Sequence, residues 1–199
     1  MTRQRTPTLP AAPDAVAKAH AVYTPFMLAF YDVLVYGVSN RIAWRCPTQR
    51  LLDLYRSNLS ANHLEAGAGT GLFLDQTGDG RLDRLALLDI SRNCLDRSQR
   101  RLARFAPELY QVNLLAPIEL ELPPFASIGL TYVLHCLPGR MHEKLAAVDY
   151  LRPLMQKGTV LSGLPFSIAV SRRTSRHERC SISITLRACS IIARTISLP

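Results

Sequence analysis

Residues 64–71 read Leu-Glu-Ala-Gly-Ala-Gly-Thr-Gly, and an aspartate, Asp89, follows 18 residues after the last glycine. The run 63–66 has the length of a short strand, and the apolar residues 72–74 begin a helical pattern. The three glycines let the backbone turn tightly and approach a ligand, because glycine has no Cβ. A helix that starts directly after such a loop points its free N–H groups at the ligand. The pattern therefore predicts a strand–loop–helix unit with a ligand bound at the loop.

Short apolar runs alternate with helical patterns through most of the remaining chain. One helix is expected to begin after the cap residue Ser91, and another spans residues 141–151. Four further strands are predicted, at residues 85–88, 109–112, 126–134 and 159–161. This alternation is typical of right-handed βαβ units around a parallel sheet. The predicted fold class is α/β, with a doubly wound, Rossmann-like, mostly parallel sheet.

The 199 residues fit one main domain with extensions at both ends. Residues 1–22 are rich in Pro, Ala and Thr and predict a flexible arm, and residues 23–60 predict a helical lid with many aromatic side chains. Residues 61–165 hold the glycine loop and the strands, so they form the predicted ligand-binding domain. Residues 166–199 are an atypical basic tail rich in Ser and Arg, in which a terminal hairpin is doubtful. Either the natural end of the chain has been lost, for example by a frameshift, or the tail is a divergent hairpin.

The formal net charge of +9 lies mostly at the end of the chain. From Ser171 onward there are six Arg and one Glu, so residues 1–170 carry only +4. The body of the chain is close to an ordinary enzyme in charge, and a nucleic-acid partner is not expected. One predicted helix carries arginines that could bind an RNA backbone, although a solvated helix face explains them without a partner. They are Arg97, Arg100, Arg101 and Arg104.

Three further features bear on location and metal binding. No run of about 18 uncharged apolar residues is present, which excludes the usual membrane-spanning helix. The first ten residues lack the apolar core of a secretory signal. The five cysteines are odd in number, scattered and without a C-x-x-C pair. We therefore expect a cytoplasmic protein with no membrane partner, no disulfide framework and no metal site.

The identity of the ligand depends on Glu65, on the glycine spacing and on Asp89. Asp89 is placed at the end of the next strand, where its carboxylate can accept hydrogen bonds from both hydroxyls of a ribose. Dinucleotide-binding loops read G-x-G-x-x-G and hold a pyrophosphate, which Glu65 would repel. A P-loop is excluded because no Gly-Lys-Ser/Thr follows. Glu65 instead suits an adenosine ligand with a cationic amino-acid end, and S-adenosylmethionine (SAM) is that ligand.

With these motifs, roughly residues 20–163 resemble the class I SAM-dependent methyltransferases. The E-x-G-x-G-x-G loop with its downstream acid is specific when it lies between a strand and a helix. Residues 30–47 and 132–139 are similar to a small group of uncharacterised bacterial and fungal methyltransferases. The resemblance implies a seven-stranded sheet, SAM as the cofactor and methyl transfer to a small-molecule acceptor. The last helix and hairpin of the superfamily are not recognisable in the tail.

The resemblance also implies which residues bind the cofactor. Glu65, Gly67 and Gly69, with Ala68 between the glycines, would line the methionine end of SAM. Asp89 would bind the ribose hydroxyls. Together these residues are expected to hold the two polar ends of the ligand.

The adenine would lie between residues from two strand ends. Ile90 is expected beside the ring, and Asn113 and Leu114 are expected at its edge. The family usually has Asp at the position of Asn113, and an amide still offers hydrogen bonds there.

The residues after the fourth strand would face the sulfonium methyl group and the acceptor. Tyr132 is expected to contact the cofactor, and His135 is the first candidate for a base if the acceptor must lose a proton. The alternative for His135 is a packed or exposed loop histidine. Tyr31 of the lid is a second candidate for contact with the acceptor, against ordinary core packing.

The predicted function is transfer of a methyl group from SAM to a small-molecule acceptor. Two alternatives stay open. One is a SAM-dependent methyltransferase that acts on RNA or protein, and the other is a SAM-binding remnant that has lost its activity.

Overall fold

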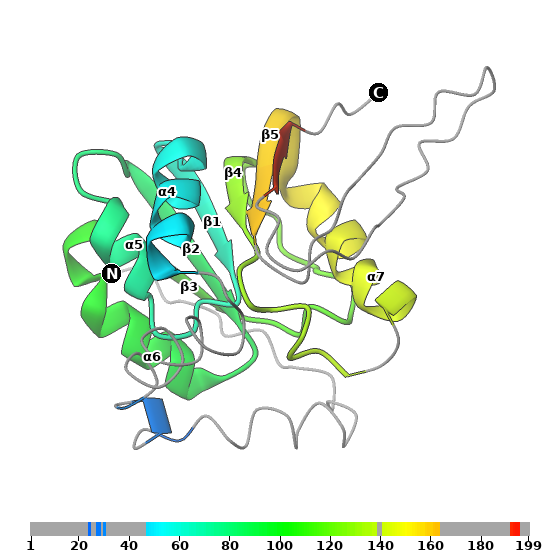
Figure 1. Cartoon of the computed structure of the whole chain (residues 1–199). Helices are drawn as coiled ribbons and strands as arrows, with labels where there is room; N and C mark the ends of the chain where they lie inside the picture. The colour runs from blue at the N-terminus through cyan, green and yellow to red at the C-terminus, as the bar shows by residue number, and fades with distance from the viewer. Residues whose placement is uncertain are drawn as a thin grey trace.

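The computed structural model describes residues 24, 27, 28, 30, 47–138, 141–163 and 192–195. In this part of the chain, strands and helices alternate as the sequence predicts (Figure 1). The helices are α4 Thr48–Asn58, α5 Leu72–Thr77, α6 Arg92–Arg101 and α7 Met141–Leu151. The strands are β1 Asn62–Ala66, β2 Arg84–Asp89, β3 Glu108–Gln111, β4 Phe125–Gly129, β5 Met155–Gly163 and β6 Ile192–Thr195.

The strands form one sheet in the order β3-β2-β1-β4-β5-β6. All neighbouring pairs are parallel except β5 and β6, which are antiparallel. The chain moves outward from β1 to β3 and then crosses back to β4, so the strand order reverses between β1 and β4. A ligand of a doubly wound sheet binds beyond the carboxyl ends of the strands at such a reversal. The predicted α/β, Rossmann-like class is confirmed.

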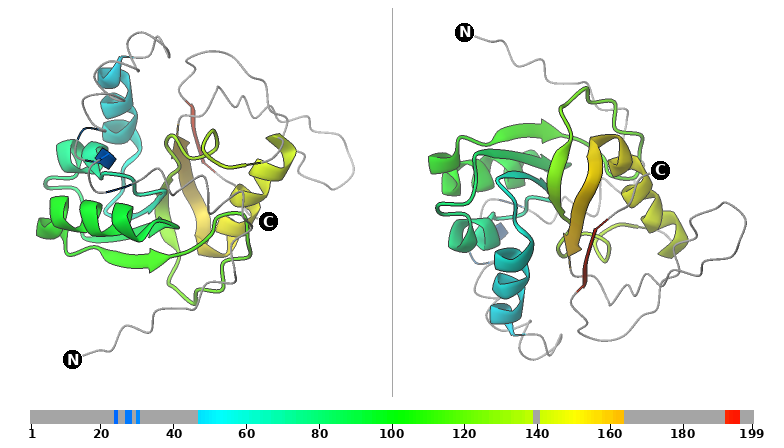
Figure 2. Two further views of the ribbon diagram at one scale, coloured as in Figure 1. Left: turned by 90° about the horizontal axis from the view of Figure 1, so that it is seen from below. Right: turned by 90° about the horizontal axis from the view of Figure 1, so that it is seen from above.

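Alternate residues of the central strands point to opposite faces of the sheet. On one face, Leu64, Ala66 and Ile128 pack against Ala147 and Leu151 of α7. On the other face, the side chains of β2 pack against α4, α5 and α6. This second cluster includes Leu85, Leu87, Leu51, Leu52, Phe73, Leu74, Leu95 and Leu102. The molecule therefore has three layers, with α4 and α7 on opposite sides of the sheet (Figure 2).

Local sequence signals set several helix starts. Ser91 precedes α6, and its hydroxyl accepts a hydrogen bond from the Cys94 N–H at 3.4 Å. Pro47 is the residue before α4, and its φ of -55° is the value that the proline ring imposes. The Thr24 hydroxyl accepts a hydrogen bond from the Met27 N–H at 3.2 Å, as a cap residue does. In the described residues, no helix is both long and apolar enough to cross a membrane.

The fourth strand ends earlier than predicted. Residues 126–134 were expected to continue as one strand, but β4 ends at Gly129. The backbone then bends away, because Tyr132 has a left-handed φ of 60° and Cys136 N–H donates back to the Val133 carbonyl at 2.9 Å. Leu130, Val133 and Leu134 are buried although they lie beyond the end of the strand. Apolar residues therefore continue through the bend, and the sequence does not show where the strand ends.

The two ends of the chain are described only in part. The arm 1–22 lies outside the described residues, as do residues 31–46 of the lid and most of the tail 166–199. Four residues of the tail, Ile192–Thr195, form β6 and pair with Val160–Gly163 of β5. This short segment of the tail is therefore part of the sheet.

Burial on the α7 face gives a test of the fold. Ile128 has no exposed surface and lies in the central strand β4, so Ile128→Ala removes packed atoms from the core. We expect a loss of about 2–5 kcal/mol in the free energy of unfolding, measured by urea titration. Lys157→Ala, at an exposed position of β5, should change it by less than about 0.5 kcal/mol. Equal stability of the two variants would contradict this arrangement of the core.

Candidate active site

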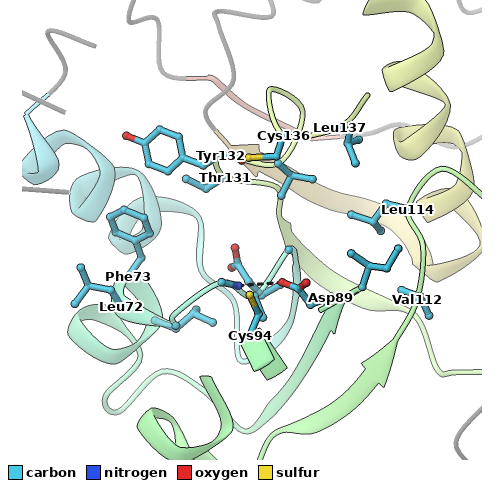
Figure 3. Close-up of a pocket in the computed structure, with 18 of the residues that line it drawn as sticks. Leu72, Phe73, Asp89, Cys94, Val112, Leu114, Thr131, Tyr132, Cys136 and Leu137 are labelled. Atoms are coloured by element: carbon cyan, nitrogen blue, oxygen red, sulfur yellow. Dashed lines mark hydrogen bonds between the residues drawn. The ribbon is translucent and has the colours of Figure 1, made fainter. Parts of the chain in front are cut away.

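A pocket opens beyond the carboxyl ends of β1, β2 and β4, at the reversal of strand order (Figure 3). The glycine loop, the segment after β3 and the bend after β4 surround it, and α4 and α5 add side chains. It is lined by Tyr55, Glu65, Gly67, Ala68, Gly69, Gly71, Leu72, Phe73, Leu74, Asp89, Ile90, Cys94, Val112, Asn113, Leu114, Thr131, Tyr132, Val133, Cys136, Leu137 and Pro138.

The structure brings the predicted cofactor residues together around this one pocket. All nine line it, namely Glu65, Gly67, Ala68, Gly69, Asp89, Ile90, Asn113, Leu114 and Tyr132. Of the two predicted catalytic residues, His135 is exposed and lies beside the pocket rather than in its lining. Tyr31 lies outside the described residues. The placement gives these residues access to a common ligand, and their roles stay predictions.

The glycine loop depends on Gly67. Its φ of 85° is left-handed, and a Cβ at this position would overlap Cγ2 of Val133. Its N–H donates to the Leu88 carbonyl at the end of β2 at 2.7 Å, and the N–H of Ala68 donates to the same carbonyl at 3.1 Å. The loop is thus held against β2 on one side and against the bend after β4 on the other.

Asp89 ends β2 and faces the glycine loop across the pocket. Its Oδ2 accepts from the Gly69 N–H at 3.2 Å, and its Oδ1 accepts from the Ser91 N–H at 2.8 Å. Burial raises the pKa of Asp89 to about 6, although N–H groups of Ser91, Gly69 and Ile90 oppose the rise. The carboxylate is held in place by the backbone and is still poorly solvated, so a ligand with hydroxyl donors can replace missing water.

Glu65, the second carboxylate of the pocket, is only 4% exposed. The Tyr55 hydroxyl donates to its Oε1 at 2.7 Å, and His63 Nε2 lies 3.1 Å from its Oε2. The neighbouring strand contributes Gly129 opposite Glu65, and a Cβ there would overlap the carboxylate. A glycine in β4 is therefore required for Glu65 to lie at this point of the sheet.

In the described part of the chain, the charged side chains that line the pocket are all acidic. Glu65 and Asp89 are its two acidic residues, and no Lys or Arg is among the described residues that line the pocket. Most other side chains of the lining are apolar. A phosphate group would find no cation there, whereas a positively charged ligand would meet two carboxylates. This pattern fits a sulfonium and ammonium ligand and not a pyrophosphate.

Aromatic rings form a row along one wall of the pocket. The rings of Tyr55 and Phe73 are stacked at 5.4 Å, and Phe73 and Tyr132 are 6.3 Å apart. The His135 ring meets Tyr132 edge-on at 5.8 Å, and its Nε2 lies 3.2 Å from Cys136 Sγ. Desolvation and the nearby Lys144 lower the pKa of His135, so its ring is neutral at pH 7 and able to accept a proton.

Cys94, at the start of α6, is not suited to nucleophilic chemistry. Burial raises the pKa of Cys94 to about 12, with Asp89 nearby as a further cause, so the thiol stays protonated. Cys94 is a buried free thiol. Among the described residues, no group of three or more His, Cys, Asp or Glu side chains could hold a metal ion.

Sequence reasoning did not identify several lining residues. Tyr55, Phe73 and Thr131 reach the pocket from three separate segments, and Cys94 lies one turn into α6. Tyr55 and Phe73 are both buried, and they also line the pocket. The packing of α4 on β1 brings the Tyr55 hydroxyl to Glu65, and this packing has no local sequence signal.

Two of the four arginines in and just after α6 bind to the protein itself. Arg101 donates to the Thr70 carbonyl at 3.0 Å. Arg104 forms ion pairs with Asp75 at 2.6 Å and with Asp79 at 2.8 Å. Two of the four arginines that suggested an RNA surface are thus engaged in holding α6 to the region of α5.

The raised pKa of Asp89 predicts a pH dependence of stability. The folded pKa of about 6 exceeds the ordinary value of 3.8, so the folded chain binds more protons between about pH 4 and 6. The contribution of Asp89 to stability therefore increases as the pH falls through this window. We expect the stability of Asp89→Asn relative to the wild type to decline when the pH is lowered from 7.5 to 4.5. Chemical unfolding of both proteins at several pH values measures this, and a constant difference would contradict the assigned shift.

Comparison with known proteins places this site in a family, although no family model matches the chain. The chain is 33% identical over 162 residues to the demethylluteothin O-methyltransferase of Streptomyces thioluteus, covering 79% of this chain and 70% of that protein. It is 32% identical over 145 residues to the physcion biosynthesis cluster O-methyltransferase of Aspergillus chevalieri, covering 72% and 65%. The matches thus span about two thirds of these relatives' own length.

Solved structures share the fold. The DhpI–SAH complex aligns with a TM-score of 0.60 at 18% identity, covering 89% of this chain and 83% of that one. The magnesium protoporphyrin IX methyltransferase of Synechocystis PCC 6803 with bound SAM aligns with a TM-score of 0.57 at 17% identity, covering 78% and 79%. The O-methyltransferase relatives and the shared fold agree with the glycine loop and the two carboxylates of the pocket. The chain belongs to the class I SAM-dependent methyltransferases.

Proposed function

We propose that the protein transfers the methyl group of SAM to a small-molecule acceptor bound in the described pocket. The observation that carries the proposal is the pair of carboxylates, Glu65 and Asp89, in a lining without Lys or Arg among the described residues. An adenosine ligand with a cationic amino-acid end matches both charges. The glycine loop lies between the two carboxylates. Because its glycines have no Cβ, the ligand can approach the loop backbone closely.

Each polar end of the cofactor has a proposed partner. Asp89 accepts hydrogen bonds from the ribose hydroxyls, since the carboxylate keeps free acceptor positions beside its Gly69 and Ser91 contacts. Glu65 pairs with the ammonium group. Ile90 and Leu114 enclose the adenine, and Asn113 is fixed beside it because its Oδ1 accepts from the Leu115 N–H at 2.9 Å.

The proposed acceptor is a small, largely apolar molecule with a hydroxyl or amine group. The aromatic row of Phe73 and Tyr132 and the side chains of Leu137 and Pro138 offer an apolar surface beside the cofactor residues. The described lining lacks a cation for the phosphates of a nucleic acid. Several relatives are named O-methyltransferases, and one, from Penicillium aethiopicum, is named an N-methyltransferase. We therefore propose an oxygen or nitrogen atom as the methyl acceptor.

Methyl transfer requires the protein mainly to align the acceptor with the methyl group and to exclude water. When bound, SAM supplies an electrophilic methyl group on its sulfonium. The acceptor atom forms its bond to the methyl carbon as the carbon–sulfur bond breaks, and the sulfur keeps the electron pair. The apolar wall excludes water and holds the acceptor in line, which can supply much of the rate. His135 lies beside the pocket and its pKa is lowered, and it is the proposed base that takes a proton from the acceptor, directly or through a water.

Binding of S-adenosylhomocysteine (SAH) and SAM tests the role of Asp89. We expect both ligands to bind the wild-type protein in titration calorimetry, and Asp89→Ala to weaken them by roughly 1.5–3 kcal/mol, or about 10- to 150-fold, since hydrogen bonds to a charged group are lost. Asp53→Ala removes an exposed carboxylate of α4 and should leave the affinity unchanged. Equal affinity of Asp89→Ala and the wild type would remove Asp89 from the site.

Turnover separates the enzyme from a binding remnant. SAH release is measured with a panel of phenols, carboxylic acids and amines, and we expect at least one class to accelerate it. If His135 accepts the proton, His135→Gln lowers kcat by roughly 10²–10⁴-fold at unchanged SAM affinity. An unchanged kcat would assign the proton to water or to another group. SAM binding without turnover of any acceptor would favour the remnant, and turnover of RNA alone would favour the nucleic-acid alternative. A cytoplasmic location stays a prediction from the cysteine pattern.

A further inference from the structure

A buried row of polar side chains lies between α4 and the sheet, next to the pocket. The parallel register of β1 and β4 sets His63 opposite Ser127 and Glu65 opposite Gly129, all on the face covered by α4. His63 is 1% exposed, Glu65 is 4% exposed and Ser127 is fully buried. Two titratable side chains and a hydroxyl are thus stacked in the core, where unpaired polar groups are costly.

The contacts of His63 determine which ring nitrogen carries a hydrogen. Nδ1 lies 2.7 Å from the Ser127 hydroxyl, and Nε2 lies 3.1 Å from Glu65 Oε2. An ionised carboxylate only accepts hydrogen bonds, so Nε2 must be the donor in this contact. Ser127 is able to donate to Nδ1 or accept from it, and it also contacts Ser60 at 2.8 Å. His63 therefore holds Glu65 through an Nε2–H group that Ser127 orients from the other side of the ring.

The Glu65 carboxylate is fixed at both oxygens. Tyr55 donates to Oε1 at 2.7 Å while His63 contacts Oε2, and the missing side chain of Gly129 provides the space for the group. These contacts occupy two acceptor positions, and a carboxylate offers about four. Since Glu65 lines the pocket, the remaining positions are available to a ligand with N–H donors.

We propose that His63 is a positioning residue that holds the Glu65 carboxylate for the ammonium group of an amino-acid-bearing nucleoside, and so makes the pocket select such ligands over plain adenosines. The inference rests on the proposed function and adds a residue that does not itself line the pocket. A histidine suits the task because its ring reaches both neighbours at once, with Nε2 toward Glu65 Oε2 and Nδ1 toward the Ser127 hydroxyl. A lysine or arginine at the same point would form an ion pair that competes with the ligand.

Two ligands and two substitutions test the proposal. SAH carries the amino-acid end, whereas 5′-methylthioadenosine keeps the adenosine and the thioether and lacks that end. In His63→Asn, the shorter side chain can replace the contact of Nδ1 with Ser127 but cannot reach Glu65. In His63→Gln, the longer side chain can place an N–H near the position of Nε2, within reach of Glu65. We expect His63→Asn to weaken SAH about tenfold or more while methylthioadenosine changes less than about threefold. His63→Gln should retain most of the affinity for SAH.

The outcomes separate this inference from the proposed function. A wild-type protein that binds neither ligand would contradict the proposed function. Binding of both ligands with an equal loss of both in His63→Asn would show that His63 only supports the fold, and would overturn the positioning role. Wild-type protein that does not prefer SAH to methylthioadenosine would overturn it as well.

A second substitution covers the case in which His63→Asn does not fold. Tyr55→Phe removes only the hydroxyl that donates to Glu65 Oε1 and keeps the ring stacked on Phe73. It should lower the affinity for SAH selectively, because one of the two contacts that orient the carboxylate is lost. An unchanged ratio of the two affinities in this variant would contradict orientation of Glu65 as the basis of selectivity.

Discussion

Burial of the Glu65 carboxylate at the end of β1 is the constraint around which this side of the molecule is arranged. A carboxylate that is 4% exposed requires hydrogen-bond donors, and Tyr55 and His63 supply them from α4 and β1. It also requires space, which Gly129 of β4 provides. The position of α4, the glycine in β4 and the histidine two residues earlier are therefore linked consequences of one charged group in the core.

The second carboxylate differs from the first in how it is held. Asp89 is fixed by backbone N–H groups at the ends of two segments, and its pKa is raised to about 6 because burial outweighs those contacts. Glu65 is held by side chains. The pocket thus combines a site suited to neutral hydroxyl donors with one suited to a cation. This combination explains why a nucleoside with a positively charged amino-acid end fits the pocket. A dinucleotide fits less well, because its negatively charged pyrophosphate would lie near both carboxylates.

The sequence predicted the regular part of this architecture because its signals are local. Strands β1 and β2, the helix after Ser91 and α7 follow from apolar periodicity and caps, and the glycine loop with Asp89 indicated where a ligand binds. The bend after β4 could not be predicted in the same way. Leu130, Val133 and Leu134 are buried in the bend and would also be buried in a longer strand, so their apolar character does not distinguish the two. For that reason His135, expected at a strand end, lies beside the pocket instead. The contact of Glu65 with Tyr55 depends on the packing of α4, and its position opposite Gly129 depends on the register between β1 and β4; no local pattern specifies either.

The two halves of the pocket also differ in regularity, and this has a physical reason. The two carboxylates proposed for the cofactor, Glu65 and Asp89, lie at the ends of β1 and β2, where the ladder of the sheet fixes the backbone. The wall proposed for the acceptor is the bend after β4, where Tyr132 keeps a left-handed φ of 60° at a cost of about 1–3 kcal/mol. Ring contacts with Phe73 and His135 help to stabilise that conformation. A segment outside the ladder can change its side chains without disturbing the strands that hold the cofactor. The division allows one fold to keep a constant methyl donor while the shape of the acceptor wall varies.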